Sequence, residues 1–63
     1  MDGTNRNDIT PGTRVLIVQK QDQRTEKLTE GTVENILTKS QTHPHGIKVR
    51  LKGGIVGRVK QIL

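Results

Sequence analysis

The sequence predicts an all-β domain, a small antiparallel barrel of four or five strands, and three observations lead to this fold class. Six Val and six Ile outnumber the five Leu, and there is no Ala; β-branched side chains fit a pleated sheet better than a helix. Residues 47–51 alternate strictly between apolar and basic side chains, which is the period of a half-buried strand. Glycines and polar stretches separate the short apolar runs.

The chain is long enough for one domain. We place it at residues 10–63, behind a polar and flexible tail at residues 1–9. The core is small and aliphatic, so we expect stability on the order of a few kcal/mol. No apolar run approaches the ~18 residues of a membrane span, and the N-terminus is too polar for a signal peptide. We therefore expect a cytoplasmic monomer that does not enter membranes.

Four strands, two long polar loops and one tight turn account for the domain. The strands are expected at residues 14–19, 32–37, 47–51 and 55–59. Residues 20–27 form the first loop and residues 38–46 the second loop, while residues 60–63 form either a short helical turn or a last strand. Two long loops followed by a tight turn are typical of an SH3-like barrel. In that topology the first and second loops meet at one rim and form one surface.

The second strand has an ambiguous pattern. Val33, Ile36 and Leu37 have the spacing of a helix face. The short length of the segment and the glycine before it favour a strand instead. A bulge near Glu34-Asn35 would place Val33 and Ile36 on the same face of that strand.

The turn between the last two strands sets their register. A three-residue loop, residues 52–54, places Gly54 where a type I turn with a G1 bulge needs a positive φ. Three pairs then point inward, namely Leu51 with Ile55, Val49 with Gly57, and Ile47 with Val59. Outside, Lys48 lies opposite Arg58, and Arg50 opposite Val56. Like charges directly opposite are unfavourable in a sheet, so either an anion lies across Lys48 and Arg58 or both side chains splay into water.

Catalytic and metal chemistry have little support in the sequence. There is no Cys, which excludes disulfides and thiolate metal sites. His43 and His45 resemble metal ligands, but a stable zinc site needs three or four ligands. We therefore expect no metal and no cofactor. Ser40 lacks the surroundings of a nucleophile, and the acids Asp22 and Glu26 lie in a charged loop with nothing to raise their pKa. We expect a binding module and no enzyme.

Charge points to the ligand class. Eleven Lys and Arg against six Asp and Glu give a net charge of +5, and a basic footprint most often suits nucleic acid. The chain has no aromatic residue, which argues against a methyl-lysine cage, a Pro-rich peptide groove and base stacking on aromatic rings. We therefore expect structured RNA, in a ribosomal or other translation setting, held by cations on its phosphates.

The candidate RNA-binding residues come from the two loops and the outer sheet face. They are Lys20, Arg24, Lys27, Lys39, His43, His45, Lys48, Arg50 and Arg58. Gln19, Gln21 and Gln23 alternate with charged residues, so in an extended chain the three amides would share one face and contact bases or a partner. A protein-interaction module that uses the polar loops or a strand edge is the alternative.

Several of these segments also resemble a known family. The runs at residues 9–12, 17–25 and 42–51, together with Gly57-Arg58-Val59 and Ile62, resemble the YwbE-like family of small microbial proteins. The resemblance covers nearly the whole chain from Ile9. It implies a free-standing cytoplasmic domain and no particular activity. A looser likeness, a Gly-x-Val followed by an alternating strand, is to KOW and other translation-associated SH3-like domains, and it concerns the fold alone.

Overall fold

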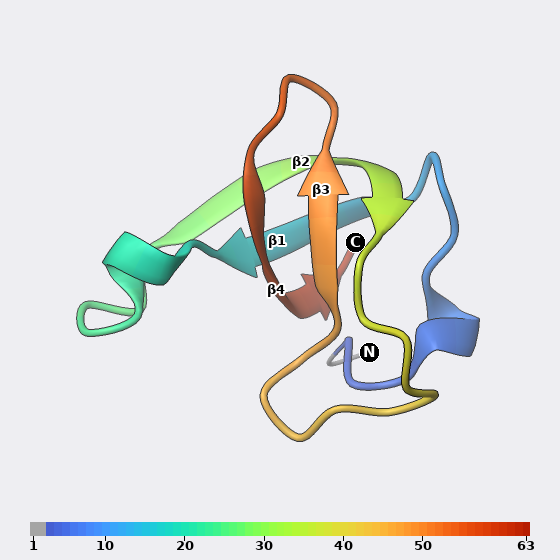
Figure 1. The fold of residues 1–63 in the computed structure, drawn as a ribbon. Helices are drawn as coiled ribbons and strands as arrows, with labels where there is room; N and C mark the ends of the chain where they lie inside the picture. The colour runs from blue at the N-terminus through green and yellow to red at the C-terminus, as the bar shows by residue number, and fades with distance from the viewer. Residues whose placement is uncertain (1–2) are drawn as a thin grey trace.

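A computed structural model describes residues 3–63 as a closed antiparallel barrel, with strands paired in the order β1-β2-β3-β4 (Figure 1). The strands are β1 (Arg14–Val18), β2 (Leu28–Ile36), β3 (Lys48–Leu51) and β4 (Val56–Ile62). Two single turns of 3-10 helix, Arg6–Asp8 and Lys20–Asp22, are the helical elements of this described part. The prediction of an all-β antiparallel barrel is confirmed, with four strands. Within residues 3–63 no helix is long and apolar enough to cross a membrane.

The interior of the barrel is a small aliphatic core. Every strand contributes to it, because inward and outward side chains alternate along each strand. Ile36 and Ile62 pack against its edge. The fully buried members are Ile9, Val15, Ile17, Val33, Ile47, Val49, Leu51 and Val59.

The predicted register between β3 and β4 is confirmed. Lys48 pairs with Arg58, and Arg50 pairs with Val56. The Gly54 amide donates to the Leu51 carbonyl at 3.0 Å and closes the three-residue loop. Two details differ from the prediction. Gly53 also has a positive φ, 99°, as position i+2 of a type II turn requires, and Ile55 is 38% exposed instead of inward.

Two strands are longer than the sequence predicted, and both contain a bulge. β2 begins at Leu28, because residues 28–32 continue the hairpin with β1. Its pairing with β3 shifts between Val33 and Asn35, so the predicted bulge is confirmed. β4 continues to Ile62, which selects the last-strand alternative for the C-terminus.

The N-terminal residues lie against the barrel. We expected residues 1–9 to be a flexible tail outside the domain, and residues 1–2 lie outside the described part. Residues 3–6, however, run antiparallel to the second loop: the Ile47 amide donates to Gly3 and the Arg6 amide to Gln41, both at 2.8 Å. Ile9 is 1% exposed and belongs to the core. The domain therefore includes this segment, which the predicted boundary at residue 10 left out.

The first loop is coiled. Lys20–Asp22 form a turn of 3-10 helix, and the Gln23 amide donates to the Lys20 carbonyl. The sequence places Gln19, Gln21 and Gln23 on one face only in an extended chain, and this 3-10 turn does not meet that condition.

Candidate functional site

Two adjoining hollows lie beside β4 and the first loop, and the second loop borders one of them. We call them the larger hollow, of about 480 Å³, and the smaller hollow, of about 310 Å³. Val18, Gln23 and Arg58 line both. The larger hollow is completed by Lys20, Gln21, Lys48, Val56 and Gly57. The smaller hollow is completed by Glu26, His45 and Lys60.

The first loop borders both hollows, and the second loop borders the smaller one through His45. The β1–β2 hairpin extends beyond the barrel and carries the first loop at its tip (Figure 1). The second loop turns back toward β3 at Gly46, which has a φ of 101°. Gln23 and His45 then line the same smaller hollow, so the expected meeting of the two loops is confirmed for these residues.

Two cations of β4 hold the second loop by its backbone. Arg58 donates from Nη1 to the Gly46 carbonyl at 3.2 Å. Lys60 donates from Nζ to the His45 carbonyl at 3.1 Å. Each contact uses one donor of a group that has three or five. The arrangement therefore fixes both positive charges at the smaller hollow and keeps further donors for a ligand.

Lys48 and Arg58 lie directly opposite each other across β3 and β4. Among residues 3–63 the ion pair that meets the usual distance criterion is Arg14 with Glu30, so neither Lys48 nor Arg58 has a carboxylate partner there. Adjacent cations without a counter-charge repel each other. An anionic ligand bound between them would remove that repulsion.

The histidines of the second loop contact each other. Their ring centroids are 5.8 Å apart, and His43 Nδ1 accepts a hydrogen bond from the His45 backbone N–H at 3.1 Å. Desolvation lowers the pKa of His43 below its ordinary value of 6.5, and the charges of Arg58 and then His45 lower it further. The lowered pKa favours the neutral imidazole of His43, in which Nδ1 can accept the hydrogen bond from His45.

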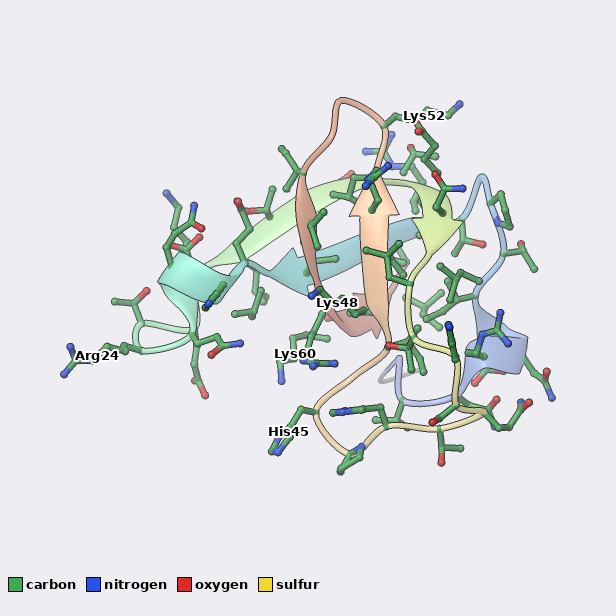
Figure 2. All side chains as sticks on the ribbon, in the orientation of Figure 1. Arg24, His45, Lys48, Lys52 and Lys60 are labelled. Carbon is green, nitrogen blue, oxygen red and sulfur yellow. The ribbon has the colours of Figure 1, made fainter. Side chains whose placement is uncertain are left out.

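Some of the predicted site residues line the hollows and others lie elsewhere on the surface. Figure 2 shows Lys48 and Lys60 between the first loop and the second loop, which carries His45, whereas Arg24 points away at the end of the first loop. The predicted residues that line a hollow are Lys20, Gln21, Gln23, His45, Lys48 and Arg58. Those exposed or half-buried outside both are Gln19, Arg24, Lys27, Lys39, His43 and Arg50. Gln19 donates to Thr29 Oγ1 at 3.2 Å.

The sequence analysis missed five residues that line the hollows, namely Val18, Glu26, Val56, Gly57 and Lys60. Pairing between β1 and β4 shifts between Leu16 and Ile17, so that Val59 and Gln61 have partners and Lys60 is the extra residue of a bulge. Bulges redirect side chains, and no glycine marks this one. Alternation along β4 does place Val56 and Arg58 on one face, and this signal could have identified Val56.

The hollows suit an anionic ligand with an apolar part. Val18, 4% exposed, provides an apolar floor beneath the cations. Within the described part of the chain, no three His, Asp or Glu side chains lie close enough to hold a metal ion. The expectation that no metal is needed remains a prediction.

Comparison with known proteins identifies relatives of the whole chain. The family described as "Uncharacterized conserved protein (DUF2196)" matches residues 2–62. The protein YwbE of Bacillus subtilis (strain 168), described as uncharacterized, is 60% identical over 63 residues, which cover 100% of this chain and 97% of YwbE. No solved structure matches the chain significantly. The resemblance to the YwbE-like family is thereby confirmed.

Proposed function

The chain belongs to the DUF2196 family of uncharacterized conserved proteins, and from its surface we propose that it is a non-enzymatic cytoplasmic module that binds RNA through the cations of the two hollows. The observation that carries this proposal is the pairing of Lys48 with Arg58, two cations held side by side without a carboxylate partner in the described part. Phosphate groups neutralise such pairs, and they supply most of the affinity in nucleic-acid binding.

The closed barrel and the side-chain amides of the site favour RNA over a protein partner as the ligand. Closure of the barrel gives each strand two neighbours, which removes the free edge strand that a partner protein would extend. Gln21 and Gln23 line the hollows together with the cations. Their amides can donate to and accept from a 2′-hydroxyl, the group that distinguishes RNA from DNA.

Fluorescence anisotropy with a labelled RNA stem–loop tests the proposal. Four Lys and Arg line the hollows, namely Lys20, Lys48, Arg58 and Lys60. If all four meet phosphates, the slope of log K against log salt is about −3 on unpaired RNA and about −4 on a duplex. A DNA stem–loop of the same sequence should bind more weakly, and equal binding of the two would contradict the assignment to RNA.

A pair of double variants locates the surface. Lys48→Gln with Arg58→Gln removes two hollow cations, and the salt slope should become shallower by about 1.5 to 2. Arg24→Gln with Lys52→Gln removes the same charge from exposed positions away from the hollows (Figure 2). This control should keep the slope of the natural protein. Equal losses in both variants would show that net charge alone binds RNA, and no binding at low salt would leave a partner protein as the ligand.

A further inference from the structure

We infer that the two hollows together hold one unpaired nucleotide of a structured RNA, with its base in the larger hollow and its phosphate in the smaller one. The inference rests on the proposed RNA binding and names the part of the RNA that is recognised. Both volumes, about 480 and about 310 Å³, lie within the ~300–1,000 Å³ range of small-ligand sites. Paired bases stay stacked inside a duplex and cannot enter such a site without being extruded.

The larger hollow has the chemistry of a base site. Val18 and Val56 give it apolar surface, and the Gly57 backbone adds a wall without a side chain. Gln21 and Gln23 bring amide groups to the same space. A nucleobase has apolar faces and a polar edge, and side-chain amides pair with such edges. Lys20 and Lys48 line the same hollow, which has no carboxylate in its lining. An unpaired nucleotide within a chain is flanked by two phosphates, so these two cations hold the second phosphate beside the base.

The smaller hollow has the chemistry of a phosphate site. Arg58 and Lys60 are fixed there by their bonds to the Gly46 and His45 carbonyls. His45 lines the same space, and Glu26 is the acidic residue there. Two cations against one carboxylate leave net positive charge beside the larger hollow.

Arg58 connects the two parts because it lines both hollows. A guanidinium is planar, so it can stack on a base while its N–H groups contact a phosphate. In a protein without aromatic residues, this group replaces the ring on which single-strand readers stack a base. The expected preference for structured RNA is kept, since bulges and loops of folded RNA present unpaired nucleotides.

Three RNA hairpins with the same stem test the inference. One is fully paired, one has a single bulged nucleotide, and one has an abasic sugar at that bulge. We expect the bulged hairpin to bind at least about fivefold more tightly than the other two, which should bind alike. In NMR titrations of the natural protein, the methyl signals of Val18 and Val56 should shift with the bulged hairpin and much less with the abasic one.

A charge-conserving variant shows whether the guanidinium plane is needed. Arg58→Lys should abolish the preference, so that the variant binds the bulged and the paired hairpins with affinities within about twofold of each other. Arg50 is exposed on β3 and lies outside both hollows. Arg50→Lys should therefore keep the preference for the bulged hairpin. Equal binding of all three hairpins by the natural protein would overturn the inference and leave the proposed function standing. Absence of binding to any hairpin at low salt would contradict both the inference and the proposed function.

Discussion

Gly46 of the second loop lies against the carbonyl oxygen of Val59 in β4, so closely that a Cβ on Gly46 would overlap that oxygen. Its φ of 101° is also in the left-handed region that side chains rarely adopt. This contact seats the second loop on β4. The loop carbonyls that Arg58 and Lys60 bind, those of Gly46 and His45, are consequently held in place by the close approach of Gly46 to β4.

Gly46→Ala should destabilise the domain by more than ~1 kcal/mol, since both the overlap and the positive φ oppose the new methyl group. Chemical denaturation measures the loss. Gly53→Ala is the control, because Gly53 has a similar φ of 99° and a methyl group there would meet no other part of the chain within 4 Å. The difference between the two variants isolates the overlap with Val59, and equal losses would show that the close approach has no energetic weight.

Ile9→Ala should cost about 2–5 kcal/mol, the range for truncating a buried Ile, and that is enough to unfold most molecules of a domain with marginal stability. Ile9 is 1% exposed and packs in the core. Ile55→Ala, at a position 38% exposed, is the matched control and should cost much less. Circular dichroism melts compare the two. A small loss of stability for Ile9→Ala would contradict the packing of Ile9 in the core and would favour the flexible tail that the sequence predicts.

The sequence determined the β3–β4 register because one arrangement alone keeps the apolar residues on one face. The strict alternation of residues 47–51 and the adjacent glycines allow a three-residue loop, which places Val49 inward and Lys48 beside Arg58. The structure has this register. This register alone predicts that Lys48 and Arg58, the paired cations of the site, lie side by side, whatever the rest of the barrel does.

Other features depended on contacts between distant segments. Ile9 is buried because residues 3–6 pair with the second loop, and nothing local to Ile9 marks that pairing. Lys60 reaches the smaller hollow through a bulge that forms opposite β1. The 3-10 turn at Lys20–Asp22 contains neither Gly nor Pro, so the sequence predicted a loop there without showing that it is coiled.

The stability of the domain should fall as the pH drops below 6.5, in part because of His43. The pKa of His43 is lowered in the fold, first by desolvation and then by the charges of Arg58 and His45. The unfolded chain therefore takes up the proton first, and stability is lost as the pH falls from 6.5 through the lower pKa of the folded state. Denaturation between pH 7.5 and 5.5, roughly above the carboxylate range, measures the loss.

His43→Gln should flatten that pH dependence, because the titrating group is gone. His45→Gln removes the exposed imidazole of the same loop, and this variant should keep most of the pH dependence of stability. Stability that is constant from pH 7.5 to 5.5 in the natural protein would contradict the assignment to His43.

Glu26 is the carboxylate of the smaller hollow, where it lines the same space as Arg58 and Lys60. A phosphate that enters this hollow approaches a negative charge as well as two positive ones. Glu26→Gln removes that charge with little change in side-chain size, so RNA affinity should rise severalfold at low salt. The gain should shrink as salt increases, because exposed charges are screened over about 10 Å at 0.1 M.

Glu34→Gln provides the matched control for this gain. Glu34 is exposed on β2 and outside both hollows, and its substitution changes the net charge by the same amount. If the smaller hollow holds a phosphate, anisotropy titrations should show a clear gain for Glu26→Gln and little for Glu34→Gln. Equal gains would mean that RNA responds to net charge and not to this hollow. A gain of affinity also cannot arise from partial unfolding, so this comparison tests the site independently of every variant that removes a cation.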